Sequence, residues 1–572
     1  MKATKSGAPA GNPPKVNSRS SISLRTWIGV GALLVAFAAM NILEMRQESC
    51  TSDEVAHLPA GYSYLLKHDF RMNPEHPPLL KVLGALPLLA LRPTMNFNDP
   101  SWNAPREQYA FGYRFLYSND ADRLLFWGRM PIVLIAILLG FYVFRWAEQL
   151  YGSLCGLFAL GLYAFCPNII AHAHLVTTDL GVGAFLLIAF YYLWRHIEKR
   201  EKRSLYWSAI AMGAALVSKF SAVMLFPMPF LLLWTLGRSS PAENRGYLAS
   251  AIKTSKGVVT KQPRKVYQRP SRQESQLKAA LRTALRLDRA KLIGMGIYAA
   301  LAALVVQLSY VGSLDPTLFF KGLFVVNTNH NPNYAGYLHG HYQIGGWWYY
   351  FLVAVLVKAT APFVLLVIAR LASFFGRFEQ EWRSALFVLF PAILLFVMIS
   401  ALADPLGVRY VLPVFPFMMV FASGLLRLRR NQRLAACTLV ILLGWHVTSS
   451  LLAYPNHIPY FNEIAGGTAH GTEWLDDSNV DWGQEMKILK GALDERGIKK
   501  MTLISFSPYD NPGYYGIHCD RAYEPPHVVS GYYVVSAHVY LRWRLLGFDW
   551  MRIADVVGDV GHSMFIFRTP RT

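Results

Sequence analysis

Long runs of apolar residues constrain the fold of this chain more than any other feature. A helix rises about 1.5 Å per residue, so about 20 apolar residues are needed to cross the roughly 30 Å hydrocarbon core of a membrane. Hydrophobic residues form 53% of the chain. Charged residues form 16%, against roughly 25% in soluble proteins. We identify eleven apolar runs, near residues 26–44, 124–145, 150–168, 175–195, 204–220, 222–237, 292–312, 347–370, 384–402, 408–427 and 433–452. The sequence therefore predicts a polytopic α-helical membrane protein with about eleven spans.

Basic residues predict which end of each span faces the cytoplasm, because Lys and Arg in short loops stay on that side. With eleven spans, the basic segments all fall on one side; they are residues 1–25, 195–203, 238–291, 370–383 and 427–433. The N-terminus is therefore expected in the cytoplasm and the C-terminus outside, in a multi-pass protein of a plasma membrane.

The formal net charge of +21 raises the question of a nucleic-acid partner. Its distribution favours another explanation, since residues 238–291 contain fourteen Lys or Arg and three acidic residues. A basic loop of this kind stays on the cytoplasmic side, which fixes the topology of the neighbouring spans, and it attracts anionic lipid. We therefore expect membrane lipid, and no nucleic acid, as its partner.

Composition divides the chain into three expected regions. Residues 1–25 read as a disordered basic cytoplasmic tail. Residues 26–454 form the membrane domain, with a large first outer loop at 45–123 that carries juxtamembrane helices. Residues 455–572 contain short β-type runs separated by turn residues, so we expect a small extracytoplasmic α/β domain there.

Titratable residues collect on the expected outer side. Charged groups at membrane depth are costly and usually face an aqueous cavity or a partner, so a one-sided cluster predicts a site. Because basic residues accompany the acids, the cluster suits an anionic ligand beside a carboxylate that handles a proton. Its members are Asp53, Glu54, His57, Glu75, His76, Arg129, His172, His174, Asp179, Lys219, the loop 327–341, Asp404 and Arg409.

Four motifs in this cluster carry a resemblance to a known family. They are "DEVAH…RMNPEHPPLLK", "HAHLVTTDLG", "DPLGVRYVLPVFPF" and "YFNEIAGG…DDSNVDWGQ". In order and sidedness they resemble the GT-C membrane glycosyltransferases, specifically the polyprenyl- and dolichyl-phosphate-mannose protein mannosyltransferase superfamily, which includes aminoarabinose lipid A transferases. The resemblance covers about residues 26–484 and implies inverting transfer of a sugar from a polyprenyl phosphate at the outer face, with no nucleotide. "DAD" at 120–122 is interpreted as a helix cap.

The resemblance implies catalytic roles for three acids. Asp53 matches the general base, and partial desolvation is expected to raise its pKa from about 3.9. Glu54 is the adjacent acid of the same motif. Asp179 matches a second family acid, and at the start of a span it would also serve as an N-terminal helix charge.

Arg129, Lys219, Arg409 and His76 are assigned to the donor phosphate. Arg suits a bidentate grip and Lys a point charge, although Arg129 could equally be an interfacial residue. His57, His330, Asn331 and Tyr410 are assigned to substrate contacts, and a packing role for His57 is as well supported. His172 and His174 fall on different helix faces, which disfavours joint metal ligation.

A divalent metal, Mg, Mn or Zn, is implied at Glu75 and His330. Glu75 matches a carboxylate that holds a metal against the lipid phosphate in the lipid A branch, but it could instead cap the helix after Pro78. His330, His339 and His341 fit no standard zinc spacing, so contacts to donor or acceptor are the preferred interpretation.

Two questions stay open at this stage. A secondary transporter is the alternative function, since polar residues at broken helices also mark transport sites, but no inverted repeat is visible. The acceptor is a protein, a glycolipid or another glycan. The chain has no Asn-x-Ser/Thr sequon, which slightly favours a bacterial plasma membrane.

Overall fold

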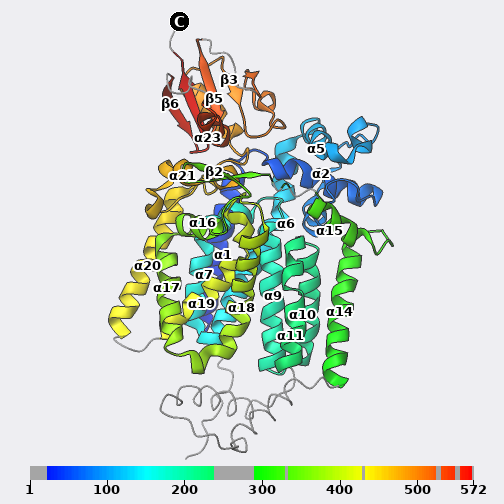
Figure 1. The fold of residues 1–572 in the computed structure, drawn as a ribbon, viewed down its shortest axis with the longest axis vertical. Helices are drawn as coiled ribbons and strands as arrows, with labels where there is room; N and C mark the ends of the chain where they lie inside the picture. Colours follow the sequence, from blue (N-terminus) through cyan, green and yellow to red (C-terminus); the bar gives the residue numbers. More distant parts are fainter. Residues whose placement is uncertain are drawn as a thin grey trace, which may run out of the picture.

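The computed structural model describes residues 22–236, 289–328, 331, 333–427, 432–523, 530–547 and 554–569. Most of the basic tail and nearly all of the 238–291 loop lie outside the described residues. Helices form a long bundle, helical segments lie across one of its ends, and a small sheet stands beyond them (Figure 1). The expected polytopic helical architecture with a C-terminal α/β region is therefore confirmed.

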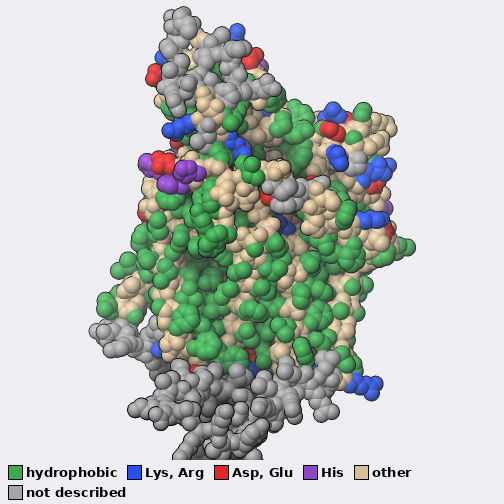
Figure 2. All heavy atoms as spheres, viewed as in Figure 1, with side chains coloured by type: hydrophobic (Ala, Val, Ile, Leu, Met, Phe, Trp, Pro, Cys, Tyr) green, Lys and Arg blue, Asp and Glu red, His purple; other side chains and the backbone are tan. Residues whose placement is uncertain are grey.

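Six helices in the described part of the chain are long and apolar enough to cross a membrane. Their exposed side chains include Leu134, Leu304 and Leu452, and hydrophobic side chains cover the middle of the bundle (Figure 2). Such a belt suits lipid, so the chain is an integral membrane protein. The six are α1 (Leu24–Met45), α6 (Ala121–Tyr151), α9 (Asp179–Glu198), α14 (Arg289–Ser309), α18 (Phe378–Leu402) and α20 (Gln432–Ala453).

Two further spans are each broken into two helices. α7 (Ser153–Ala164) and α8 (Pro167–Ala173) meet at 65°, and α16 (Tyr350–Lys358) and α17 (Ala361–Phe375) meet at 117°. Pro167 and Pro362 occupy the first turns of α8 and α17, where proline starts a helix but cannot continue the preceding one. Counting each bent pair as one span gives eight in the described residues.

The remaining predicted runs are helical but short. They correspond to α10 (Lys202–Leu216), η3 (Phe220–Leu225) with α11 (Pro227–Leu236), and η4 (Val408–Val411) with α19 (Val414–Ala422) and η5 (Ser423–Arg427). Each of the eleven runs therefore contains helix, but a count of eleven spans is not confirmed. α15 (Leu318–Thr328) is another short apolar helix.

Helices of the first long loop pack over one end of the bundle (Figure 1). Two glycines permit the close packing, because a Cβ on Gly61 would lie 2.0 Å from the Lys81 carbonyl oxygen and one on Gly112 would lie 1.7 Å from that of Val55. These elements are α2 (Ser52–Lys67), α3 (Leu79–Ala85), α4 (Leu88–Leu91), η1 (Pro100–Asn103), η2 (Pro105–Glu107) and α5 (Gln108–Tyr117).

A five-stranded mixed sheet stands above this end in the order β4-β3-β5-β7-β6. β3 runs parallel to β4 and β5, whereas β7 is antiparallel to β5 and β6. The strands are β3 (Thr502–Ile504), β4 (Asp520–Arg521), β5 (Tyr532–Ser536), β6 (Asp555–Val560) and β7 (Met564–Arg568), with helices α22 (Met486–Glu495) and α23 (Ala537–Leu545). Leu489 and Leu493 of α22 pack against Leu503, Val534 and Ile566 of the sheet.

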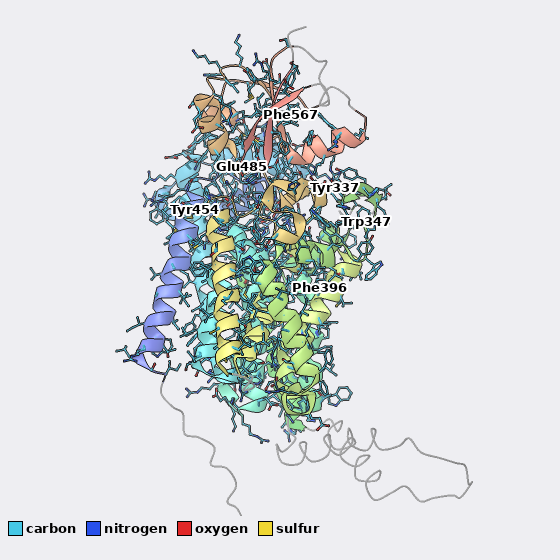
Figure 3. All side chains as sticks on the ribbon, turned by 90° about the vertical axis from the view of Figure 1, so that its left-hand side faces the viewer. Tyr337, Trp347, Phe396, Tyr454, Glu485 and Phe567 are labelled. Carbon is cyan, nitrogen blue, oxygen red and sulfur yellow. The ribbon has the colours of Figure 1, made fainter. Side chains whose placement is uncertain are left out.

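Short elements connect the bundle to the sheet. Figure 3 shows Glu485 and Tyr337 in this intermediate layer, between Phe396 in the bundle and Phe567 in the sheet. The connecting elements are the hairpin β1 (Ala335–Leu338) and β2 (His341–Ile344), η6 (Glu463–Ala465), η7 (Thr468–His470), α21 (Gly471–Trp474) and η8 (Asp477–Asn479).

Candidate functional site

Four charged side chains from four separate segments meet where the bundle joins the outer-loop helices. Arg409 Nη1 lies 2.8 Å from Asp53 Oδ2 and 3.8 Å from Asp179 Oδ2. Lys219 Nζ lies 2.5 Å from Asp179 Oδ1. Asp53, Arg409, Asp179 and Lys219 therefore form one continuous chain of alternating charge.

Local structure places each of these residues. Asp53 lies in the first turn of α2, and Asp179 is the first residue of α9. Lys219 is an extended residue between α10 and η3. The position expected for Asp179, an acid at a helix N-terminus, is confirmed, and there the helix dipole favours its charge.

Arg409 is held in η4 by the 476–479 segment. Gly407 precedes η4 with φ of +151°, and a Cβ there would lie 2.5 Å from Ser478 Oγ. Ser478 Oγ donates to the Leu406 carbonyl oxygen at 2.6 Å, and the Val408 amide donates to Asn479 Oδ1 at 2.9 Å. The position of Arg409 thus depends on residues about 70 positions later in the chain.

Aromatic rings flank both cations. The Arg409 guanidinium carbon lies 4.2 Å from the centre of the Trp482 ring, and Lys219 Nζ lies 4.2 Å from the centre of the Tyr410 ring. Such contacts stabilise a desolvated cation and restrict its side chain. Tyr410, assigned to substrate contacts, therefore lies at the site and supports Lys219.

The cluster is open to solvent at one side and retains unused polar atoms. The side chains of Asp53, Lys219 and Arg409 are 18%, 13% and 11% exposed, whereas that of Asp179 is 2% exposed. Asp179 Oδ2 and Arg409 Nε have no hydrogen-bond partner among the described residues. Buried polar atoms are normally paired, so these two mark a place for a ligand's polar atoms.

The pKa of Asp53 differs from the expectation. Burial alone would raise the pKa of this carboxyl, but the adjacent Arg409 guanidinium, with smaller contributions from His57 and Lys219, lowers it below its ordinary value. The expected rise is therefore wrong for this arrangement. Desolvation has the largest single effect on this pKa, but Arg409, His57 and Lys219 together outweigh it.

Glu54 and Arg129 form a buried ion pair behind Asp53. Arg129 Nη2 lies 2.6 Å from Glu54 Oε2, and both side chains are at most 1% exposed. The same guanidinium also donates to the carbonyl oxygens of Met45 and Ser49. Glu54 Oε1 accepts from the Val176 amide at 3.0 Å, three residues before Asp179.

These contacts favour a structural role for Glu54 and Arg129, and their expected catalytic and phosphate-binding roles stay predictions. Four of the five guanidinium N–H groups of Arg129 donate inside the protein, and its side chain is only 1% exposed. Glu54 accepts from Arg129, from Val176 and from the Thr51 amide and hydroxyl. Through these contacts Glu54 joins the start of α2 to the segment before α9, and we propose that both residues act as positioning residues.

Lys81, which the sequence reading did not single out, anchors the turn that carries Glu75. Its buried Nζ donates to the carbonyl oxygens of Asn73 and His76, both at 2.7 Å, and to Tyr64 Oη at 2.8 Å. Burial lowers the pKa of Lys81 to about 7, against the effect of Glu75. The sequence shows a lysine shortly after a Pro pair. It does not show that this lysine binds the carbonyl oxygens of the preceding turn, because they come together only in the folded chain.

Glu75 is half-buried and accepts a hydrogen bond from Gln108 of α5. It does not cap α3, whose N-terminus has no side-chain cap. Among the described residues Glu75 lies in no group of three metal ligands, and its expected partner His330 lies outside them. The described residues therefore do not form a metal site at Glu75, and the metal-binding role of Glu75 stays a prediction.

The two histidines of the first outer loop contact each other. The ring centres of His57 and His76 lie 4.9 Å apart, and His57 Nδ1 lies 2.8 Å from the Val176 carbonyl oxygen. Burial lowers the pKa of both imidazoles, strongly for His76. A neutral His76 can donate one N–H to a phosphate but supplies no positive charge.

The loop after α15 lies against the connecting layer. Asn331 is exposed, and in the described part of the chain it accepts hydrogen bonds from the amides of Asn333 and Tyr334. Tyr334 Oη donates to Asp477 Oδ2 at 2.8 Å, and the His339 ring stacks on Trp474 at 4.5 Å. Substrate contacts by His330 and Asn331 therefore stay predictions.

Sequence reasoning also missed Trp482, whose ring contacts both Arg409 and His172. Trp482 lies within the "DDSNVDWGQ" motif, but the motif alone does not show that its ring contacts Arg409. The helix-cap interpretation of "DAD" is confirmed, since Asp120 caps α6 by accepting from the Arg123 amide.

Comparison with known proteins identifies one family. Residues 122–254 match the family of dolichyl-phosphate-mannose-protein mannosyltransferases. This range contains Asp179 and Lys219, whereas Asp53 and Arg409 lie outside it. No curated protein sequence matches the chain.

Several solved structures are similar at low identity. ArnT from Cupriavidus metallidurans bound to undecaprenyl phosphate is 13% identical, covering 95% of this chain and 98% of that chain, with a TM-score of 0.45. The Archaeoglobus fulgidus oligosaccharyltransferase in its apo form is 12% identical, covering 88% and 62%, with a TM-score of 0.43. The S. cerevisiae Pmt1-Pmt2 complex bound to its sugar donor is 18% identical, covering 52% and 36%, with a TM-score of 0.28.

These structural likenesses are too weak to assign an activity, so the assignment rests on the family match. That match agrees with the resemblance carried by the sequence motifs. Residues 122–254 are thus similar to the dolichyl-phosphate-mannose-protein mannosyltransferases, a family of GT-C membrane glycosyltransferases.

Proposed function

We propose that this protein transfers a sugar from a polyprenyl-phosphate donor to an acceptor at the extracytoplasmic face of the membrane, with inversion at the anomeric carbon. The observation that carries the proposal is the placement of Arg409 between Asp53 and Asp179, with Lys219 alongside. One partly exposed carboxylate, Asp53, thus lies with two partly exposed cations, Lys219 and Arg409, and this reaction requires both kinds of group.

Lys219 and Arg409 would bind the donor phosphate. When the bond between the anomeric carbon and the phosphate oxygen breaks, negative charge grows on the departing phosphate, and fixed cations stabilise that charge. Asp179 holds both cations from behind through its ion pairs. The unpartnered Arg409 Nε is a further donor for a phosphate oxygen.

Asp53 would act as the general base. The acceptor's oxygen or nitrogen forms the new bond to the anomeric carbon, and its proton passes to the Asp53 carboxylate. Without donor, Arg409 keeps the pKa of Asp53 low. A donor phosphate that shares Arg409 would weaken this contact, raise the pKa of Asp53 and make it a stronger base when the substrate is in place.

An apolar cavity in the bundle supports a lipid-linked donor. It has a volume of about 340 Å³ and lies among α16, α17, α18 and α19, and its walls include Phe363, Phe396, Val414 and Phe415. Phe415 follows Arg409 by six residues. A polyprenyl chain could lie in this cavity while its phosphate reaches Arg409 and Lys219.

The test begins with mass spectrometry of lipids that copurify with the protein, which identifies the donor class. Transfer is then measured with that polyprenyl-phosphate sugar in proteoliposomes, and the product anomer is read by NMR. We expect Asp53→Asn to lose about 10²–10⁴-fold in turnover while it still binds donor. Asp69→Asn, an acid elsewhere in the same loop, is the matched control. Wild-type turnover by Asp53→Asn, or a product that retains the donor configuration, would reject the mechanism.

A further inference from the structure

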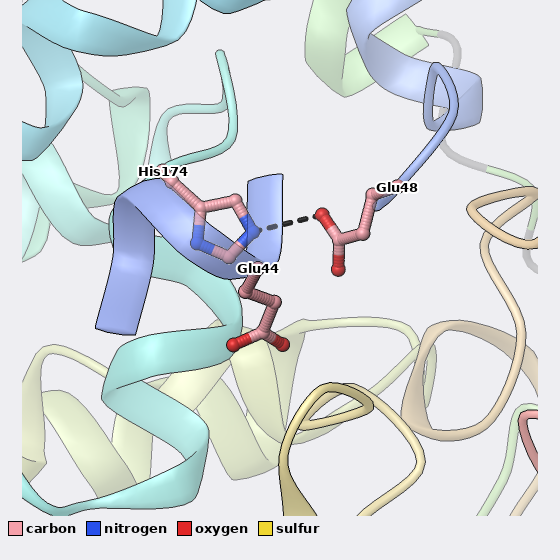
Figure 4. Close-up of side chains that lie close together, drawn as sticks. All are labelled: Glu44, Glu48 and His174. Atoms are coloured by element: carbon pink, nitrogen blue, oxygen red, sulfur yellow. Dashed lines mark hydrogen bonds and ion pairs between the residues drawn. The ribbon is translucent and has the colours of Figure 1, made fainter. Parts of the chain in front are cut away.

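A second cluster of titratable side chains lies at the end of α1, apart from the four-charge cluster. Glu44, Glu48 and His174 each offer one ligand atom, and these atoms all lie within 4.8 Å of one another (Figure 4). All three side chains are at most 3% exposed. Figure 4 shows His174 directed toward Glu48, with the Glu44 carboxylate below the imidazole ring.

Hydrogen bonds fix which nitrogen of His174 carries its proton. Asn41 Nδ2 donates to the Phe37 carbonyl oxygen at 2.9 Å, so Asn41 Oδ1 is the atom that faces His174 Nδ1 at 3.0 Å. That oxygen can only accept, so Nδ1 is protonated. Nε2 then faces Glu48 Oε2 at 2.8 Å, and in a neutral imidazole both atoms would present lone pairs. A positive charge is needed between them, either a proton or a metal ion.

The adjacent His457 has the same arrangement. Its Nε2 faces the Ser450 carbonyl oxygen at 3.0 Å, which can only accept, and its Nδ1 lies 2.5 Å from Glu44 Oε2. Two buried carboxylates therefore face two imidazoles whose other nitrogens are already protonated. Two protons, or one divalent cation, bring the group to zero net charge.

The spacing of the carboxylates favours the cation. If two protons were present, the group would be two separate ion pairs, Glu44 with His457 and Glu48 with His174. The two carboxylates would then gain nothing by approaching each other, because like charges repel strongly when desolvated. Instead both carboxylates have an oxygen within 4.8 Å of the same His174 nitrogen. A shared cation accounts for this convergence.

We propose that Glu44, Glu48 and His174 bind a divalent transition-metal ion, Zn²⁺ or Mn²⁺. Two carboxylate oxygens and one imidazole nitrogen are ligands that both ions accept. Asn41 would be the outer partner that orients the imidazole, a feature typical of metal-bound histidines. Binding one ion would displace the proton between His174 and Glu48, whereas the proton between His457 and Glu44 would remain.

The proposed metal would connect the two segments that carry the acids of the candidate active site. Glu48 precedes Asp53 by five residues, and His174 precedes Asp179 by five residues. An ion that joins these segments would restrict the separation of Asp53 and Asp179. This metal is distinct from one at Glu75, and the proposal stands whether or not the sugar-transfer proposal is correct.

Metal content of the purified full-length protein tests the proposal. The protein is depleted with a chelator and dialysed against Zn²⁺ or Mn²⁺ alone, and bound metal is then measured by inductively coupled plasma mass spectrometry. We expect one equivalent bound by the wild type, and at least a tenfold loss of affinity in Glu48→Gln and His174→Asn. Glu75→Gln should bind as the wild type does, which separates the two candidate sites.

A matched control is Asp476→Asn, since Asp476 is another buried carboxyl and lies outside the ligand group. It should leave metal binding unchanged. Co²⁺ substitution provides a second readout, with visible ligand-field absorption in the wild type and none in His174→Asn. If a variant fails to fold, the wild type still decides, because a wild type that binds neither Zn²⁺ nor Mn²⁺ would overturn the proposal. Full retention of the metal by a folded Glu48→Gln would overturn it as well.

Discussion

At the scale of single residues, the site depends on which charge each side chain contacts. The sequence indicated Asp53, Asp179, Lys219 and Arg409, because charged residues in a membrane protein are few and these lie near span ends. It did not indicate their pairing. Arg409 lies 356 residues after Asp53, and only the fold shows that its charge lowers the pKa of that carboxyl.

The first prediction concerns Arg409. Arg409→Lys keeps a positive charge but removes the planar guanidinium that contacts Asp53, Asp179 and Trp482. Charge-assisted hydrogen bonds contribute about 1.5–3 kcal/mol, so we expect the Kd for the polyprenyl phosphate to rise about 10–100-fold. Arg114→Lys changes an arginine of a surface ion pair in the first outer loop, and it should leave the Kd unchanged. An equal Kd in Arg409→Lys would exclude Arg409 as a phosphate ligand.

The second prediction concerns the buried pair of Glu54 and Arg129. Arg129→Met leaves the Glu54 carboxylate buried without its cation, so we expect a loss of about 3–5 kcal/mol in stability. Adding Glu54→Gln to this variant should restore part of the loss, because the unpaired charge is removed. Thermal unfolding of both variants measures the effect.

Donor binding distinguishes a positioning role from a phosphate contact for Arg129. The double variant, once folded, should bind polyprenyl phosphate with a Kd within a few-fold of the wild type. A loss in Kd as large as that of Arg409→Lys would return Arg129 to the phosphate site.

At the scale of helices and strands, apolar runs predicted where helices occur but not their length or angle. The run 347–370 is two helices that meet at 117°, and the run 408–427 contains three short segments. Prolines gave a signal for these breaks, whereas the packing of α2 on α3 and α5 depends on Gly61 and Gly112, whose neighbours are visible only in the fold. The C-terminal strands were indicated by their β-type runs, but their mixed order was not.

The third prediction concerns buried acids in the connection to the sheet. Burial raises the pKa of Asp510 to about 7 and that of Asp481 to about 6, and the Asp481 charge adds to the rise at Asp510. The folded state therefore holds protons that the unfolded state releases near pH 4. Stability from these groups is present below that pH and is lost as the pH rises from about 4 to 7.

Asp510→Asn should remove much of this dependence. At pH 8 we expect it to be more stable than the wild type by on the order of 4 kcal/mol, since it buries no charge, and at pH 4 the difference should be small. Hydrogen exchange over residues 502–521 measures the local free energy of opening. Asp494→Asn, whose side chain is 63% exposed, should show no such change between the two pH values. A wild-type pH slope in Asp510→Asn would contradict the account.

At the scale of the whole molecule, the α/β region and the four-charge cluster share one end of the bundle. The turn between α9 and α10 lies at the opposite end (Figure 1). The basic segments predicted this sidedness from the sequence, but the end that faces the cytoplasm is a property of the membrane and not of the fold. We propose that the sheet end is extracytoplasmic.

The fourth prediction tests this orientation by labelling introduced cysteines in intact cells. In a background with Cys437→Ser and Cys519→Ser, Lys499→Cys on the sheet side should react with a membrane-impermeant maleimide. Lys202→Cys, at the start of α10, should react only after the cells are opened. Both lysines are exposed in the structure, so access depends on the membrane. The reverse pattern would invert the topology.

The most direct test of the central claim is to locate the donor phosphate by photo-crosslinking. A polyprenyl phosphate with a diazirine on the isoprene unit next to the phosphate is bound to the protein in nanodiscs, irradiated, and mapped by peptide mass spectrometry. We expect adducts near Arg409, Lys219 and the start of α2, with a loss of these adducts in Arg409→Lys. Adducts confined to the opposite end of the bundle, near residues 196–203, would contradict the proposal that these charges meet around a lipid phosphate.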